Sequence, residues 1–196
     1  MILCVQIENI RVCLNSFAPL MDRYQRGEVN FPDDALKWLE EAEKTMSALR
    51  LPDGAEMSSL RGRILKAADA LATDDAKPPR SAVRRARNAA AADALDRAEA
   101  ILRNRLLTAE ERLKLFEDKL CEGMTAFLLQ NLLPDTVAPH QTWLLLVWDR
   151  LRQFQATRPL TLYLAVSLSQ VDRSFILDRV LSRSATSDFI RSETAA

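Results

Sequence analysis

Few residues in this sequence are of the types that acid–base or metal chemistry needs. The chain has one histidine, His140, which follows Pro139 and has no second histidine with which to share a metal ion. Zinc sites of the HExxH kind and the paired ExxH units of di-iron bundles are therefore excluded. A catalytic histidine also needs an oriented partner. We expect His140 to be a solvated loop residue.

Other catalytic and cofactor-binding patterns are absent as well. Cys4, Cys13 and Cys121 form neither a CxxC pair nor a disulfide framework, and they favour reduced thiols in a cytoplasm. With four glycines, the chain contains no glycine-rich phosphate loop and no GxSxG nucleophile elbow. We therefore expect no catalytic, cofactor-binding or metal site, which favours a non-enzymatic role while leaving an enzyme open.

Charge is segregated along a chain whose net charge is zero. Residues 77–105 carry eight basic and three acidic side chains, a net charge of +5, whereas residues 31–49 carry −3. Cations at the start of a helix oppose its dipole, which suggests an anionic partner beside them. The candidate patch for that partner consists of Lys77, Arg80, Arg84, Arg85 and Arg87.

Three explanations fit this segregation. The acidic segment can lie beside the basic one within the fold, the arginines can bind the phosphates of a nucleic acid, or they can dock an acidic protein. Intramolecular pairing is favoured, since no aromatic residues alternate with the arginines to support nucleic-acid binding.

The second candidate surface is an apolar helix predicted over residues 141–156. Trp143 and Trp148 are five positions apart and therefore lie on different sides of this helix, with four apolar residues between them. A helix that is apolar nearly all round lies in the centre of a core or is covered by another subunit. The candidate apolar interface consists of Trp143, Leu144, Val147, Trp148 and Leu151.

Helices must position these residues, because the composition and the periodicity both favour them. Residues 7–24 predict a helix with a kink or break at Pro19, and Gly27 is its expected C-cap. Asn30 is the expected N-cap of the next helix. Thr108 begins a capping-box pattern, so we expect a new helix from Ala109, either separate from the preceding one or continuing it after a slight bend. The other helices are predicted over residues 31–49, 56–72, 80–107, 109–132, 141–156 and 171–183, with a frayed tail from residue 184.

Residues 160–169 have the composition of a short strand as well as of a buried helix. We predict a helix, because a lone strand would have no partner in this chain. We therefore expect an all-α fold, an antiparallel bundle of six to seven helices. Residues 1–135 would form the main bundle and residues 136–196 would pack on it, together as one compact domain.

The expected location is cytoplasmic, since no apolar stretch reaches membrane-spanning length and the N-terminus lacks the basic region of a signal peptide. For function, we favour a helical interaction protein: an adaptor, chaperone or assembly subunit that binds a protein partner or a second copy of itself through helix faces. Two alternatives are a nucleic-acid-binding or regulatory protein that uses residues 77–105, and a helical bundle that binds a small ligand.

Overall fold

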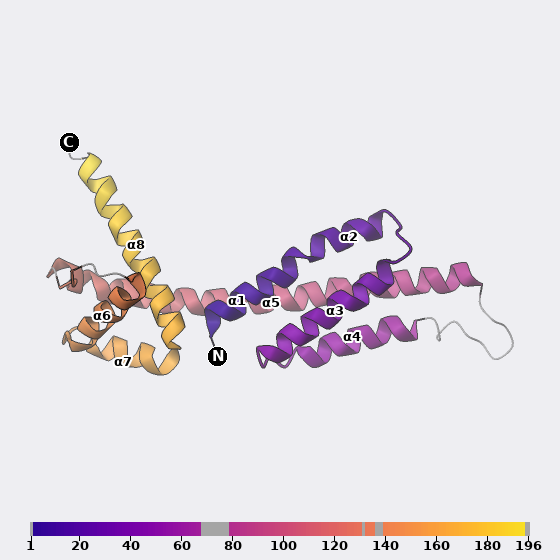
Figure 1. Ribbon diagram of the computed structural model, residues 1–196, viewed down its shortest axis with the longest axis horizontal. Coiled ribbons are helices and arrows are strands. Elements are labelled where there is room, and N and C mark those ends of the chain that lie inside the picture. The colour runs from indigo at the N-terminus through magenta and orange to yellow at the C-terminus, as the bar shows by residue number, and fades with distance from the viewer. Residues whose placement is uncertain (1, 68–78, 131, 136–138, 195–196) are drawn as a thin grey trace. The chain divides into compact units, whose positions relative to one another are not determined.

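The computed structural model describes residues 2–67, 79–130, 132–135 and 139–194, with side chains as far as residue 183. These residues form helices and no strand, so the fold is all-α, as the sequence predicts. Figure 1 shows the helices in chain order. They are α1 (Leu3–Asn15), α2 (Phe17–Gln25), α3 (Phe31–Ala48), α4 (Gly54–Lys66), α5 (Arg80–Leu129), α6 (His140–Gln153), α7 (Arg158–Ser167) and α8 (Gln170–Thr194).

The contacts divide the chain into two units. The N-terminal unit consists of Gln6–Thr108, and the C-terminal unit consists of Met1–Val5 together with Ala109–Ala196. Helices α1 and α5 therefore contribute residues to both units. This division lies within α5, whereas the sequence places a boundary near residue 135; the expected packing of residues 136–196 on 1–135 stays a prediction.

In the N-terminal unit, helices α1–α4 and the first half of α5 share one hydrophobic core. Helices α3 and α4 form an antiparallel hairpin, which is plain in Figure 1. On α5, Ala94, Ala98 and Leu102 are fully buried. Small side chains at successive turns let neighbouring helices approach α5 closely.

The first predicted helix is interrupted, but at Ser16 instead of Pro19. Because α2 begins at Phe17, Pro19 lies in its first turn, where the missing N–H costs no helical hydrogen bond. The Ser16 hydroxyl donates to the Cys13 carbonyl at 2.7 Å and accepts from the Trp38 indole at 3.0 Å. At the break between α1 and α2, hydrogen bonds of the Ser16 side chain thus take the place of helical backbone hydrogen bonds.

The two helices predicted on either side of Thr108 are one continuous helix, α5. The Thr108 hydroxyl donates to the Asn104 carbonyl, one turn earlier, at 2.9 Å. The predicted capping box was wrong because no glycine or proline occurs between residues 80 and 122 to interrupt the helix. Asn30 precedes α3 as predicted, but its side chain makes no capping hydrogen bond there.

Helices α2 and α3 end in the same backbone motif. Two successive N–H groups after each helix bond back to carbonyls of its last turn, and the first belongs to a residue in the left-handed region. After α2 this residue is Gly27, with φ of 67°, the predicted C-cap. After α3 it is Arg50, with φ of 55°. A left-handed arginine is strained where a glycine is not.

Replacing Arg50 by glycine should therefore raise the free energy of unfolding by about 1 kcal/mol. The arginine side chain is exposed, so little packing is lost. Gly27→Ala at the equivalent position should lower stability by a similar amount. Urea unfolding of both variants measures these effects, and a destabilised Arg50→Gly variant would show that the cap does not form as described.

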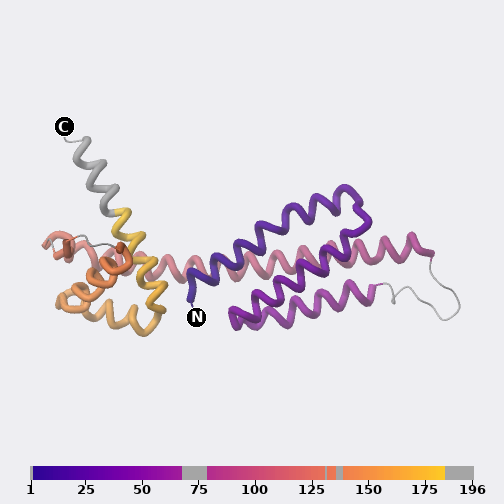
Figure 2. The backbone as a smooth tube through the Cα atoms, viewed as in Figure 1, coloured from indigo at the N-terminus to yellow at the C-terminus, as the bar shows by residue number. Residues whose placement is uncertain are grey.

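In the C-terminal unit, helices α6, α7 and α8 pack with the second half of α5. Figure 2 traces the backbone through these helices. Residues 160–169 lie mostly in α7, so the predicted helix is confirmed. Helix α8 reaches Thr194, so the backbone stays helical beyond residue 184, where the sequence predicts a frayed tail. Phe127, Val147, Leu164 and Ile176 are fully buried and represent the four helices in this core.

Candidate interaction surface

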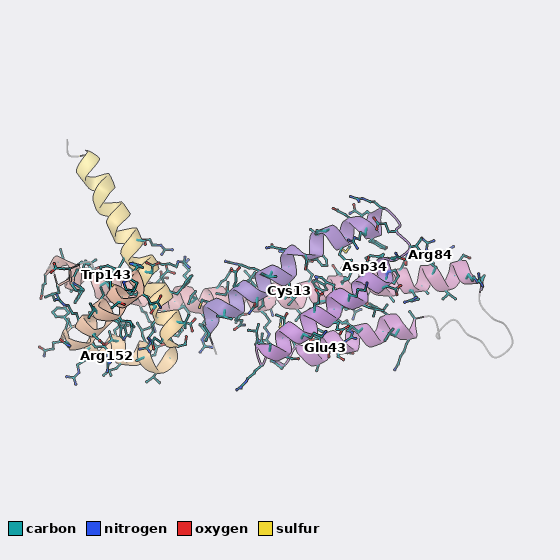
Figure 3. The ribbon with its side chains drawn as sticks, viewed as in Figure 1. Cys13, Asp34, Glu43, Arg84, Trp143 and Arg152 are labelled. Carbon is teal, nitrogen blue, oxygen red and sulfur yellow. The ribbon has the colours of Figure 1, made fainter. Side chains whose placement is uncertain are left out.

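The basic patch predicted from the sequence lies at the start of α5 in the N-terminal unit. Arg87 forms an ion pair with Asp33 of α3 at 2.9 Å. Arg84 donates to the carbonyl of Gly27, after α2, at 3.0 Å, and Figure 3 labels this side chain. Lys77 lies outside the described residues. Two of the five predicted residues thus make contacts within the fold.

The acidic helix α3 has further basic partners in this unit. Arg23 lies 2.6 Å from Asp34, and Arg61 lies 2.6 Å from Glu43; Figure 3 labels both acidic residues. These pairs and the Arg87 pair favour intramolecular complementarity as the reason for the segregated charge. Because Arg87 already has an acidic partner, the patch offers less charge to nucleic-acid phosphates.

His140 is the first residue of α6 and is not isolated. Its Nε2 lies 2.8 Å from Asp178 of α8, and its ring stacks on Trp143 with centroids 5.5 Å apart. Both members of the His140–Asp178 pair are exposed. Among the described residues, no group of three His, Cys, Asp or Glu side chains could hold a metal ion.

Most of the predicted apolar interface lies in the core of the C-terminal unit. Four of its five residues on α6 are buried there: Leu144, Val147, Trp148 and Leu151. The fifth, Trp143, is half-buried and donates its indole N–H to the Pro134 carbonyl at 3.2 Å. Figure 3 labels this side chain. These residues thus have intramolecular partners, and the large apolar residues that α6 exposes are Leu145 and Leu146.

Helix α7 instead presents an apolar face to solvent. Leu162, Tyr163 and Val166 are 52%, 46% and 91% exposed, and Pro159 is also exposed. Their spacing of three, one and three residues places all four on one helical stripe. We call Pro159, Leu162, Tyr163 and Val166 the α7 stripe. An exposed apolar stripe on a short helix is typical of a binding surface.

The opposite face of α7 explains why the stripe points outward. Leu164 and Thr161 are fully buried, and the Thr161 hydroxyl donates to the Arg158 carbonyl at 2.9 Å. Leu160 fits closely against α5, because a Cβ added to Gly123 would lie 2.4 Å from it. A polar threonine and a fitted leucine thus occupy the core face, and the remaining apolar side chains are left outside.

The side chains beside the stripe are mainly basic. The Lys119 ammonium lies 4.5 Å from the centroid of the Tyr163 ring. Leu162 lines a cavity of about 510 Å³ together with two basic residues, Arg152 and Arg158, and one acidic residue, Asp149. An apolar stripe with a basic rim complements a partner with apolar and acidic residues.

Asp172 of α8 is fully buried and links two helix starts within the C-terminal unit. Its carboxylate accepts the Cys4 backbone N–H of α1 at 2.9 Å and the Ser169 hydroxyl at 2.8 Å. Burial raises the pKa of this carboxyl, but these hydrogen bonds outweigh burial and leave the pKa below its usual value of 3.8.

Cys4 is correspondingly unreactive. Burial, the hydrogen bond to Asp172 and the charge of Asp172 together raise the pKa of the Cys4 thiol to about 11. The thiol therefore stays protonated at neutral pH, and protonated thiols are poor nucleophiles and poor metal ligands. The contact between Cys4 and the buried Asp172 thus serves the structure of the unit.

Comparison with protein-family models, with curated protein sequences and with solved structures finds no match to this chain. Among the described residues, every helix is too short or too polar to serve as a membrane span. Evidence for a function therefore comes from the contacts and exposure of the chain's own residues.

The sequence reasoning missed the α7 stripe, although its spacing is visible in the sequence. Residues 160–168 also carry a second apolar series at four-residue spacing, Leu160, Leu164 and Leu168. Two apolar stripes on one short helix leave open which one faces the core. The space beside Gly123, which decides the orientation, depends on tertiary packing.

Proposed function

We propose that this protein is a non-enzymatic interaction protein that binds an acidic amphipathic helix of a partner protein through the α7 stripe. The observation that carries the proposal is the exposed apolar face of α7, above all Val166 at 91% exposure. An amphipathic helix recognised in this way inserts apolar side chains at three- and four-residue spacing. The cytoplasmic location remains an expectation from the cysteine usage.

Two features support a partner protein over a second copy of this chain. The basic rim of Lys119, Arg152 and Arg158 would face the same charges in a symmetric pair of stripes, and like charges across an interface are unfavourable. The stripe has four residues, well below the roughly 20–30 residues per side of a standard interface. A single docked helix suits a surface of this size.

Nucleic-acid binding has less support. It would need the arginines at the start of α5, and Arg84 and Arg87 already contact α2–α3 residues in the same unit. Adaptor, chaperone and assembly-subunit roles all remain compatible with one helix-binding surface, and the identity of the partner would distinguish them.

The stripe can be tested by placing acidic residues on it. In a Leu162→Asp/Val166→Asp variant, affinity for a partner that co-purifies with the native protein should fall by at least about 30-fold, because buried apolar anchors carry most of the binding energy. Titration calorimetry with the purified partner measures the change. Circular dichroism checks that the variant is folded.

Leu107→Asp is the matched control, since Leu107 is 57% exposed on the part of α5 that belongs to the N-terminal unit. It should bind the partner as the unmodified protein does. Equal losses in both variants, or none in the stripe variant, would contradict the proposal. Sedimentation of the purified chain gives a further outcome: a dimer that depends on the stripe would overturn the assignment to a different protein.

A further inference from the structure

A second feature of the C-terminal unit is a cavity between α6 and α8, which contains no residue of the α7 stripe but shares Asp149 and Arg152 with the cavity beside Leu162. Its volume is about 190 Å³. One wall is apolar and is formed by Leu144, Leu145 and Leu177. An apolar cavity of about 150 Å³ is large enough to hold benzene, so this one has room for an aromatic ring with a small substituent.

The cavity also has two guanidinium groups in its lining, Arg152 of α6 and Arg173 of α8. Figure 3 labels Arg152. The Arg152 guanidinium lies 3.9 Å from Asp149, the one acidic residue of the lining, and both side chains are more than half exposed. Such a pair contributes little, so Arg152 retains most of its capacity to bind another anion.

Among the side chains that the structure describes, Arg173 has no acidic partner, and two other contacts hold it in place. Its Cζ lies 5.2 Å from the centroid of the Trp148 ring, and its Nε donates a long hydrogen bond of 3.4 Å to the Ser169 carbonyl. Stacking on an indole orients a guanidinium while leaving its outer N–H groups available.

Trp148 adds an unsatisfied donor to the same wall. The residue is 7% exposed, and its indole N–H has no hydrogen-bond partner among the described residues. Buried donors without partners are uncommon in proteins. The lining therefore combines an apolar wall with two cationic donors, Arg152 and Arg173, and also includes Asp149, Gln170 and Ser174.

We propose that the α6–α8 cavity binds a small organic monocarboxylate with an apolar body of about the size of benzoate. The carboxylate accepts hydrogen bonds from Arg152 and Arg173, and the apolar body lies against Leu144, Leu145 and Leu177. Two arginines and one aspartate leave a single net positive charge, which matches a monoanion better than a phosphate dianion. The apolar wall excludes a fully polar anion.

Titration calorimetry of the full chain with sodium benzoate tests this site. For a ligand of nine non-hydrogen atoms we expect a dissociation constant of roughly 0.1–1 mM. Benzamide has the same shape without the charge, and acetate has the charge without the ring. Both should bind at least about tenfold more weakly than benzoate, because benzamide lacks the charge that the arginines bind and acetate lacks the ring that packs on the leucines.

The arginines are tested by Arg152→Gln and Arg173→Gln, each of which should weaken benzoate binding by about tenfold or more. Arg112→Gln, at an exposed arginine of α5 outside the cavity lining, should leave it unchanged. The comparison of benzoate with benzamide uses the unmodified protein, so it holds even if a variant unfolds.

Absence of saturable benzoate binding would overturn the proposal, as would equal affinities for benzoate and benzamide. The single variant Val166→Asp, which places a charge on the α7 stripe, should still bind benzoate, because Val166 lines neither this cavity nor the one that Leu162 shares with Arg152. Failure of the ligand site and failure of the stripe are therefore distinguishable.

Discussion

Replacing both Arg179 and Arg183 by methionine should lower the free energy of unfolding by about 3–5 kcal/mol. Their guanidinium groups lie 3.5 Å and 2.5 Å from the carboxylate of Glu117 on α5. The Glu117 side chain is 3% exposed, whereas the arginines are 44% and 60% exposed. Loss of the arginines therefore leaves a buried charge without compensation.

Removing the carboxylate instead of the arginines should lower the free energy of unfolding much less. Glu117→Gln removes the buried charge and leaves two arginines that reach solvent, so we expect a loss of about 1 kcal/mol. With Glu117→Gln already present, the arginine substitutions should add little. Both arginines make other contacts, so the coupling from the double-mutant cycle is the quantity to compare.

Urea unfolding of these variants measures the coupling. Arg97→Met is the matched control, because Arg97 pairs with Asp93 at 3.0 Å on an exposed face of α5. This substitution should lower the free energy of unfolding by at most about 0.5 kcal/mol. If the Arg179/Arg183 double variant is no less stable than this control, Glu117 does not hold α8 to α5 as described.

Asp172→Ala is the second substitution expected to have a large effect, a loss of about 3 kcal/mol. The alanine leaves the Cys4 backbone N–H and the Ser169 hydroxyl without their carboxylate acceptor, at a fully buried position. Asp172→Asn keeps an acceptor oxygen and should lose less. Thermal or urea unfolding at neutral pH ranks the three proteins.

The same carboxylate predicts a pH dependence. The pKa of Asp172 in the folded state lies below its usual value of 3.8, so its ionised form stabilises the fold fully above that value. This contribution is lost as the pH falls through the folded-state pKa. The stability difference between the unmodified protein and Asp172→Asn should therefore shrink below about pH 4. A difference that stays constant or grows in acid would contradict the hydrogen bonding described.

The fold class could be predicted because apolar residues recur at helical spacing throughout the chain. The boundaries were less predictable, and two copies of one pattern show why. Thr108–Glu111 and Ser169–Asp172 both match the capping-box spacing. Only the second is a cap, with the Asp172 N–H 3.1 Å from the Ser169 hydroxyl. Thr108 fails because the chain before it continues as a helix, whereas Ser169 follows the end of α7.

The burial of the Glu117 carboxylate could be predicted in part from the sequence. Glu117 lies on the same helical stripe as Leu113, Leu120 and Met124, all of which are buried. A carboxylate on such a stripe indicates a buried ion pair. The position of its arginine partners, more than sixty residues later in α8, depends on tertiary structure.

The candidate surfaces could be predicted less well. Four of the five interface candidates on α6 are apolar because they form the core, and two of the arginines at the start of α5 pair within the fold. Periodicity shows that a face is apolar, but which face is covered depends on close contacts such as Leu160 beside Gly123. The stripe on α7 follows from that contact.

The most direct test of the α7 stripe is site-specific photo-cross-linking of the protein in its native cells. A photoreactive phenylalanine derivative replaces Val166 in one variant and Leu107 in the control, and the cross-linked segment is mapped by mass spectrometry. We predict a discrete adduct from position 166 alone, formed with an amphipathic, acidic helix of another protein and lost when Leu162→Asp is added. No adduct at position 166, the same adducts at both positions, or an adduct with a second copy of this chain would contradict the account.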